Sequence, residues 1–219
     1  TYVVIVAGGA GKRMGSVLPK QFLLLKNKPV LYYTINAFLN ALPECKVIVV
    51  LPEEHLELGK EIVDGFFDAQ RIQLTVGGET RFHSVQNGLK LVEEESIIFV
   101  HDGVRCLVQE ELIQRCYTTA LETGSAVPAI ECRDSVRMIT DEGNDPVDRS
   151  KLRLVQTPQT FHSKILLAAF AIDYKPWFTD EANVVEAFGL KVTLVQGDDT
   201  NIKITNPIDL VIAEKILED

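Results

Sequence analysis

The sequence predicts an α/β protein with an open, mostly parallel sheet and helices on both faces. Short, continuous apolar runs recur along the chain, as expected for strands that are buried on both sides. Between them lie longer segments whose apolar residues repeat at helical spacing. Strands that alternate with helices in this way are typical of parallel sheets. Because the chain has 219 residues, of which 46% are hydrophobic, we expect one domain over residues 1–219.

The first half of the chain shows this alternation most clearly. Tyr2–Val6 predicts the first strand, and Val30–Leu39 predicts the first helix. Lys46–Leu51 is a largely apolar run that ends at Pro52, as expected of a buried parallel strand. The next predicted elements are a helix over Leu56–Phe67, a strand over Ile72–Val76, a helix over Phe82–Val92 and a strand over Ile97–Val100.

The second half continues the alternation with one interruption. The predicted elements are a helix over Gln109–Glu122, a strand over Ser125–Ile130, helices over Lys164–Ile172 and Asp180–Phe188, a strand over Lys191–Val195 and a helix from about Pro207. Within residues 131–156, the segments Ser135–Ile139 and Lys151–Val155 flank a polar turn at Asp141–Pro146. We interpret residues 131–156 as a hairpin-like insertion, which either serves function or covers the edge of the sheet.

A glycine-rich loop follows the first predicted strand, with the sequence AGGAGKRMG over residues 7–15. Glycines let the backbone approach a ligand closely, and Lys12, Arg13 and Lys20 add positive charge to a chain of net charge −9. This combination predicts a phosphate-binding loop. It departs from the dinucleotide fingerprint because Met14 replaces the third glycine, and from the Walker loop because Arg13 follows the Gly-Lys pair. The alternative is a tight strand-to-helix connection.

Asp102 and Arg105 come just after the strand predicted over Ile97–Val100. Ligands in open α/β sheets bind at the carboxyl edge of the strands. Asp102 is a candidate ligand for Mg²⁺, which takes one or two protein carboxylates and completes its shell with phosphate oxygens and water. The alternative is that Asp102 caps the following turn. We expect a structural role for His101, because nothing near it in the sequence marks it as a base.

A second glycine pair, Gly77 and Gly78, follows the strand predicted over Ile72–Val76. The missing side chains allow a flat ligand to approach the backbone, whose polar groups can read a base edge with help from Ser84. Helix capping by Thr80 is the structural alternative and is compatible with base binding.

Lys203 lies late in the chain, between Ile202 and Ile204. If this segment is a strand, the lysine points to the face opposite its two apolar neighbours. Taken alone, the pattern indicates a solvent-exposed lysine.

The composition argues against several classes of partner. No apolar stretch is long enough to cross a bilayer, and the first apolar run lacks the flanks of a signal peptide. The acidic balance argues against nucleic-acid binding by a basic face. Cys45, Cys106, Cys116 and Cys132 have no metal-ligand spacing, and we expect them to be reduced. These observations predict a cytoplasmic protein without nucleic-acid or membrane partners.

Six motifs in order resemble those of the 2-C-methyl-D-erythritol 4-phosphate cytidylyltransferases, enzymes of non-mevalonate isoprenoid biosynthesis. They are VAGGAGKRMG with PKQF, VGGETRFHSVQNGL, HDGVR, DRSKLRLVQTPQTF, TDEANVVEAFG and NIKITNPIDL. The resemblance runs over the whole chain, so it is more specific than a single glycine-rich loop. It implies a Rossmann-like, three-layer nucleotidyltransferase fold, and a homodimer that exchanges the arm formed by residues 131–156.

The same resemblance implies a role for each matching residue. The phosphates of CTP are expected on Ala7, Gly8, Gly9 and Gly11 with Arg13 and Lys20, the cytosine against Gly78, Glu79 and Ser84, and Gly103 beside the nucleotide. Asp102 becomes the Mg²⁺ ligand, while Arg105, Lys203 and Thr179 line the polyol phosphate side. Ser135, Arg149 and Thr157 are expected to come from the arm of the partner subunit. Arg13, Lys20 and Lys203 are the expected catalytic residues.

The implied reaction is attack by the phosphate of a polyol phosphate on the α-phosphorus of CTP. The phosphate is already anionic at neutral pH, so catalysis reduces to positioning and charge neutralisation. Ribitol 5-phosphate is the alternative acceptor, since the Ala-Gly-Gly loop and Val104 also suit cytidylyltransferases that use it. Ser84-Val85 and the TDEA sequence that begins at Thr179 favour methylerythritol phosphate.

Two further functions remain as alternatives. A catalytically silent nucleotide-binding protein would be expected to have lost Lys20, Asp102 or Lys203, and all three are present. An NAD-dependent oxidoreductase is disfavoured by Met14 in place of the third glycine.

Overall fold

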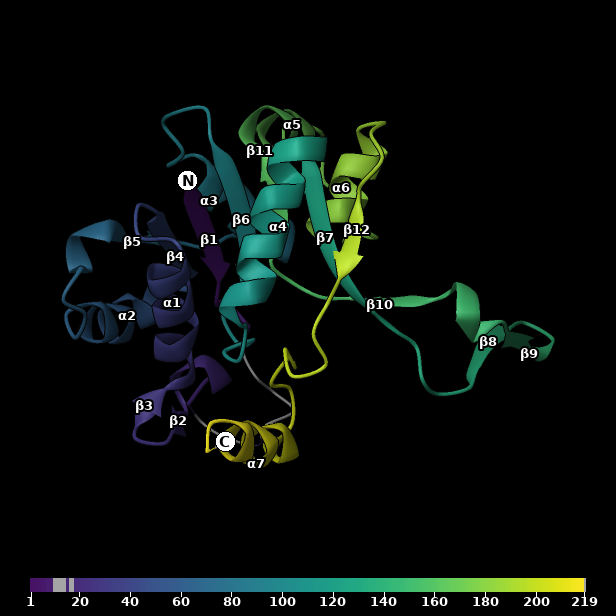
Figure 1. The fold of residues 1–219 in the computed structure, drawn as a ribbon, viewed down its shortest axis with the longest axis horizontal. Coiled ribbons are helices and arrows are strands. Elements are labelled where there is room, and N and C mark those ends of the chain that lie inside the picture. The colour runs from purple at the N-terminus through teal and green to yellow at the C-terminus, as the bar shows by residue number, and fades with distance from the viewer. Residues whose placement is uncertain (10–14, 16–17, 219) are drawn as a thin grey trace.

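The computed structural model describes residues 1–9, 15 and 18–218. Its main sheet has the strand order β10-β7-β11-β6-β1-β4-β5, and β12 also pairs with β7. Helices cover both faces of this sheet, and an arm that carries β8 and β9 extends away from it (Figure 1). The predicted α/β fold with a mostly parallel sheet is confirmed.

The centre of the sheet consists of four parallel strands. They are β1 (Tyr2–Val6), β4 (Lys46–Leu51), β5 (Ile72–Val76) and β6 (Ile97–Asp102). Val6, the last residue of β1, is in register with Val50 of β4 and with Asp102 of β6. The carboxyl ends of these strands therefore meet at one edge, where Asp102 is the final residue of β6 and not the first residue beyond it.

An antiparallel strand, β11 (Gln159–His162), lies between β6 and β7 (Ser125–Glu131). The sequence pattern does not predict β11, because its four residues include three polar ones and lack an apolar run. Its placement depends on pairing with two strands from other parts of the chain. At the far side of β7, β12 (Leu194–Gln196) pairs in parallel and begins at Leu194 instead of Lys191.

Alternate residues of the central strands pack against two different groups of helices. Val3, Val47 and Phe99 face α1 (Val30–Ala41), α2 (Leu56–Val63) and α4 (Glu110–Thr123). Val4, Ile48 and Val100 face α3 (Arg81–Leu89), α5 (Ser163–Ala169) and α6 (Glu181–Ala187). Both faces of the sheet are thus buried, which explains why its strands read as continuous apolar runs. No helix in the described residues is both long and apolar enough to span a membrane.

A third apolar cluster lies under α7 (Pro207–Ile216), beside the small sheet of β2 (Leu24–Leu25) and β3 (Lys28–Pro29). In it, Leu25, Val104 and Ile204 are buried together. The backbone N–H of Ile204 donates to the carbonyl of Val104 at 3.0 Å. This packing fixes the segment before α7, which carries Lys203, although that segment is not a strand. The strand geometry considered for Lys203 therefore does not apply.

The arm differs from the predicted hairpin. Its two strands are β8 (Val136–Thr140) and β9 (Gly143–Val147), which pair with each other. Gly143 has a φ of 140°, which allows a tight turn directly after Asp141 and Glu142. The other predicted arm strand is β10 (Arg153–Val155), which pairs with β7 in the main sheet.

Several shorter features complete the chain. The 3₁₀ turns are η2 (Lys20–Phe22), η3 (Glu53–His55), η4 (Ala69–Arg71) and η5 (Arg149–Lys151). The helix predicted to reach Phe67 ends at Val63, and a turn closes there because the N–H of Gly65 donates to the carbonyl of Ile62. Phe67 is 99% exposed and contributes nothing to the core.

Candidate active site

A cavity of about 610 Å³ opens at the carboxyl edge of β1, β4, β5 and β6. Both glycine-rich loops contribute to its wall, through residues 7–9 and 77–80. Lys20, Asp102 and Lys203 also line it, although they come from widely separated parts of the sequence. The structure therefore brings these predicted site residues together at the sheet edge where ligands bind in open α/β folds.

The wall formed by residues 77–80 is shaped by backbone contacts. The N–H of Gly78 donates to Oγ of Ser84 at 3.1 Å, and this hydroxyl donates to the carbonyl of Thr80 at 2.9 Å. A Cβ on Gly78 would lie 2.4 Å from Cβ of His83, so only glycine fits there. Thr80 also caps α3 by accepting from the N–H of His83. Helix capping by Thr80 is therefore confirmed, and base binding by the same loop stays a prediction with which this geometry is compatible.

The wall formed by residues 7–9 is held at its base by Gln21. The Gln21 side-chain amide donates to the carbonyl of Ala7 at 2.6 Å, and both residues are buried. Gly8 and Gly9 are exposed and line the cavity. Gly11 and Arg13, predicted to bind phosphate, lie outside the described residues.

Lys20 joins this loop region to the late segment of the chain. Its ammonium donates to the carbonyl of Ile204 at 2.8 Å, and the residue is only 8% exposed. The contact places Lys20 beside the segment that carries Lys203. Two of the three predicted catalytic cations thus line one cavity.

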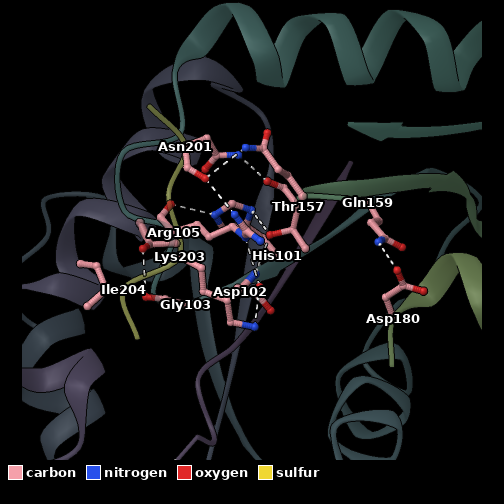
Figure 2. A network of polar contacts seen from close by, with 12 residues as sticks. His101, Asp102, Gly103, Arg105, Thr157, Gln159, Asp180, Asn201, Lys203 and Ile204 are labelled. Atoms are coloured by element: carbon pink, nitrogen blue, oxygen red, sulfur yellow. Dashed lines mark hydrogen bonds and ion pairs between the residues drawn. The ribbon is translucent and has the colours of Figure 1, made fainter. Parts of the chain in front are cut away.

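Asp102 lies at the centre of a group of cations (Figure 2). Its Oδ2 is 3.1 Å from Nζ of Lys203 and 3.2 Å from Nε of Arg105, and its Oδ1 is 3.5 Å from a terminal nitrogen of Arg81. Burial alone would raise the pKa of the Asp102 carboxyl, but Arg81, Lys203 and Arg105 outweigh it and hold that pKa well below its ordinary value. The site therefore keeps an ionised carboxylate despite its burial.

Arg81 and Glu181 are site residues that the sequence analysis missed. The Arg81 guanidinium contacts both carboxylate oxygens of Glu181, which is fully buried. Arg81 also lines the cavity. Glu181 lies 100 residues later in the chain. In the sequence, Arg81 comes shortly after the glycine pair Gly77-Gly78 and directly after the capping residue Thr80. This position beside a predicted ligand-binding loop is the local pattern that could have indicated Arg81 as a site residue.

Thr157 and His101 form a buried hydrogen-bond network with the backbone N–H of Asp102 (Figure 2). The N–H of Asp102 donates to Oγ1 of Thr157 at 3.1 Å, and this hydroxyl lies 3.0 Å from Nδ1 of His101. Nε2 of His101 lies 3.0 Å from the carbonyl of Arg105, which can only accept. A neutral His101 protonated on Nε2 satisfies all three groups. Burial lowers the pKa of His101 to about 4, which supports this neutral form and its predicted structural role.

The position of Thr157 corrects one prediction. We expected Thr157 on the arm of a partner subunit, but it is buried in the same chain as Asp102, just before β11. The carbonyl of Thr157 accepts from the Asn201 side chain at 2.8 Å, and the carbonyl of Asn201 accepts from Arg105 at 2.8 Å. Asn201 is therefore a third residue of this site, after Arg81 and Glu181, that the sequence did not predict.

The remaining predicted residues lie around this centre or away from it. Gly103 packs against the first loop, since a Cβ there would lie 2.8 Å from Cβ of Ala7. Thr179 is exposed, and its hydroxyl donates to the side-chain oxygen of Asn183 at 2.7 Å. Ser135 and Arg149 are exposed on the arm. Neither Ser135 nor Arg149 lines the cavity of its own chain. The arm that carries β8 and β9 extends away from the main sheet (Figure 1).

Asp102 would give Mg²⁺ a carboxylate ligand in the cavity, and the other ligands would come from substrate and water. The described residues contain no group of three or more acidic, histidine or cysteine side chains that could hold a metal. Asp102 supplies one ionised carboxylate inside the cavity. Mg²⁺ commonly uses one or two carboxylates and takes its other ligands from substrate phosphates and water. The residues therefore fit a metal that arrives with a phosphorylated substrate.

Comparison with known proteins gives a consistent result over the whole chain. The family described as IspD, 2-C-methyl-D-erythritol 4-phosphate cytidylyltransferase, matches residues 1–219. A protein of that name from Bacteroides thetaiotaomicron is 45% identical over 215 residues, which is 98% of each chain. Another from Porphyromonas gingivalis is 42% identical over 217 residues, covering 99% of this chain and 97% of the relative.

Solved structures agree with the sequence relatives. A 4-diphosphocytidyl-2C-methyl-D-erythritol synthase from Anaerococcus prevotii superposes with a TM-score of 0.84 at 27% identity, covering 100% of this chain and 98% of the other. The 2-C-methyl-D-erythritol 4-phosphate cytidylyltransferase from Thermus thermophilus gives 0.78 at 31% identity, with 99% and 98% covered. The predicted nucleotidyltransferase-like fold is confirmed by these likenesses. The chain belongs to the 2-C-methyl-D-erythritol 4-phosphate cytidylyltransferase family.

Proposed function

We propose that this protein transfers the cytidylyl group of CTP to 2-C-methyl-D-erythritol 4-phosphate, releasing pyrophosphate and forming 4-diphosphocytidyl-2-C-methyl-D-erythritol. The observation that supports it best is the cavity that joins the loop of Gly77 and Gly78 to Asp102, Lys20 and Lys203. One part of such a site can bind a nucleobase while the other neutralises phosphates. Membership of the family supports the same substrates.

The reaction needs no general base, because the attacking oxygen belongs to a phosphate that is anionic at neutral pH. The site agrees with this chemistry. No histidine lines the described cavity, and His101 beneath Asp102 is neutral and fully hydrogen-bonded. Turnover then depends on alignment of the two phosphates and on neutralisation of their charge.

Charge neutralisation is the role we assign to Lys20, Lys203 and Arg13. In-line attack on the α-phosphorus gathers negative charge around one centre as pyrophosphate leaves. Lys20 is nearly buried, so its charge acts in a medium of low effective dielectric. Lys203 is held at Asp102, from which it can face a phosphate on the open side. Arg13 belongs to the same proposal on its sequence position alone.

Magnesium belongs to the proposal as a cofactor that Asp102 would hold. When bound, Mg²⁺ would neutralise phosphate oxygens and polarise the α-phosphorus. Asp102 is ready for this role because its carboxyl is ionised and aimed into the cavity. Thr157 contributes by fixing the backbone N–H of Asp102.

The polyol phosphate site is proposed to combine two subunits. Arg105 and Thr179 would contribute from this chain, and Ser135 and Arg149 would come from the arm of a second copy. The arm extends away from the body, and its hairpin pairs only with itself among the described strands. An arm of this shape is suited to exchange between subunits in a homodimer. A cytoplasmic location completes the proposal, because its four cysteines are free thiols.

The test is a pyrophosphate-release assay with CTP and each of two acceptors, methylerythritol phosphate and ribitol 5-phosphate, with and without EDTA. We expect release with methylerythritol phosphate, and loss of release when EDTA is present. Preference for ribitol 5-phosphate would contradict the proposed substrate. No release with either acceptor, together with CTP binding by calorimetry, would identify a silent nucleotide-binding protein. Turnover that persists in EDTA would contradict the metal requirement.

A further inference from the structure

A buried ion pair joins α3 to α6 at the side of the cavity. One terminal nitrogen of Arg81 donates to Oε1 of Glu181, and the other donates to Oε2 at 3.2 Å. Arg81 is the first residue of α3, and Glu181 is the first residue of α6. The Glu181 side chain is fully buried, whereas that of Arg81 is 26% exposed at the cavity. The fork geometry fixes the plane of the guanidinium.

Stability alone is a poor explanation for this pair. Removing two charges from water costs free energy that their attraction often fails to repay, so apolar residues of similar size serve a core at least as well. Burial raises the pKa of the Glu181 carboxyl, and Arg81 opposes that shift. The cost of burying Glu181 suggests that its partner Arg81 has a second task.

That task is visible in how the cations divide the two oxygens of Asp102. Arg105 and Lys203 both approach Oδ2, at 3.2 and 3.1 Å. Arg81 approaches Oδ1, at 3.5 Å. We propose that Arg81, held in plane by Glu181, is a positioning residue that sets the rotation of the Asp102 carboxylate. Without Arg81, two cations pull on Oδ2 and no ion pair among the described residues holds Oδ1.

Glu181 is itself firmly placed, which makes it a suitable anchor. The Gln159 side chain accepts from the N–H of Ala182 at 2.8 Å. It also donates to the carboxylate of Asp180 at 3.0 Å (Figure 2). Gln159 belongs to β11, which pairs with β6, the strand that ends at Asp102. Glu181 therefore connects to Asp102 by two routes, one through the sheet and one through Arg81. The route through the sheet fixes the backbone of Asp102 but leaves its carboxylate free to rotate. The route through Arg81 fixes the orientation of that carboxylate.

The loop proposed to bind cytosine does not depend on the Arg81 side chain. Its hydrogen bonds run between Gly78, Ser84 and Thr80. Loss of the Arg81 side chain should therefore leave CTP affinity nearly unchanged while slowing the chemical step. This separation distinguishes a positioning role from direct binding of the nucleotide.

The experiment compares three variants in the pyrophosphate-release assay, with CTP affinity measured by calorimetry and stability by thermal unfolding. Arg81→Met/Glu181→Met removes both charges and keeps the volume, so the fold has no unpaired buried carboxylate. Glu181→Gln keeps Arg81 and the shape of the pair, but weakens the anchor. Arg71→Met is the matched control, since Arg71 pairs with Asp68 and two backbone carbonyls away from the cavity.

We expect the double variant to melt within a few degrees of the parent, to keep its CTP affinity within about threefold, and to lose kcat by a factor on the order of 10 to 100. Glu181→Gln should show a smaller loss of kcat with unchanged CTP affinity. Arg71→Met should melt earlier and keep its kcat.

Two results would overturn the inference. A folded double variant with parental kcat would show that Arg81 only compensates Glu181, and weaker CTP binding with parental kcat would show that Arg81 is a nucleotide ligand. If the double variant does not fold, a parental kcat in Glu181→Gln would likewise overturn the inference. The inference rests on the proposed cytidylyl transfer, which the parent protein tests in the same assay: an inactive parent contradicts the function, whereas an active parent with unaffected variants contradicts only the role of Arg81.

Discussion

Lys20 and Lys203 come from distant parts of the chain and line the same cavity, where each would neutralise phosphate charge in the proposed reaction. We expect Lys20→Ala and Lys203→Ala each to lower turnover by a factor on the order of 10² or more, the usual effect of losing one charge-stabilising group. Steady-state pyrophosphate release measures this effect. Lys164→Ala is the control, because Lys164 is exposed and pairs with Glu95 outside the cavity. Near-parental turnover in either site variant would exclude that lysine from catalysis.

His101 gives the protein a pH-dependent stability. Burial lowers its pKa to about 4, from an ordinary value of about 6.5. Between these values the unfolded chain binds a proton that the folded chain does not, so stability is full above the ordinary pKa and falls as the pH drops toward the folded one. We expect about 2 kcal/mol to be lost between pH 7 and pH 5 through this group. Urea unfolding at the two pH values measures it.

The variant His101→Gln isolates this contribution. Glutamine does not titrate, and it can still donate to the carbonyl of Arg105, as His101 does. We expect the variant to be less stable than the parent at pH 7 but to show a smaller difference between pH 7 and pH 5. An equal difference in parent and variant would assign the pH dependence to other groups.

For single residues, the sequence predicts site side chains that directly follow a strand. It does not predict residues whose contacts form only when distant segments of the chain come together in the fold. Asp102 and Lys20 could be selected because each adjoins a local pattern, a buried strand or a glycine loop. Glu181 could not, because it sits in an ordinary helical pattern and acquires its meaning from Arg81 on another helix. Asn201 is similar, since its contacts join Thr157 and Arg105 from distant segments.

Among the elements, the arm hairpin formed by β8 and β9 exposes two large apolar side chains. Met138 is 55% exposed and Ile139 is 82% exposed. We expect Ile139→Asp to weaken the proposed homodimer, because a second copy would cover this surface and charged groups are costly at an interface core. Sedimentation at a series of concentrations measures the change.

The matching control for this experiment is Ile208→Asp on α7, where Ile208 is 60% exposed. Helix α7 lies away from the arm hairpin (Figure 1). Its association should equal that of the parent protein. If Ile139→Asp leaves association unchanged as well, the arm does not form the interface.

Elements with strong local patterns could be predicted closely, whereas elements defined by pairing could not. β5 has the predicted bounds, because its residues form a clear strand pattern between two helices. β11 escaped prediction because its polar sequence becomes a strand only between β6 and β7. The partner of β8 was also misassigned, because the tight turn at Gly143 shortens the hairpin and leaves β10 to pair with β7.

For the whole molecule, the arm exchange we propose predicts complementation between two inactive subunits. A subunit with Arg149→Ala has an intact cavity and a defective arm, whereas one with Lys20→Ala has the reverse. Mixed dimers should therefore regain one working site. Activity is measured after the two variants have been unfolded and refolded together, with differently tagged subunits to verify mixing. Verified mixed dimers without activity would contradict the exchange of Arg149.

The contact between Lys20 and Ile204 spans 184 residues of the chain, and this has a consequence for synthesis on the ribosome. The two glycine-rich loops and Asp102 emerge from the ribosome well before residues 203 and 204 are made. A nascent chain thus contains the residues proposed to hold the nucleotide before the carbonyl of Ile204, which accepts from Lys20 in the folded protein, has been made. We expect the ability to bind CTP to precede the ability to consume it, so that catalysis begins only when the late segment closes over the early one.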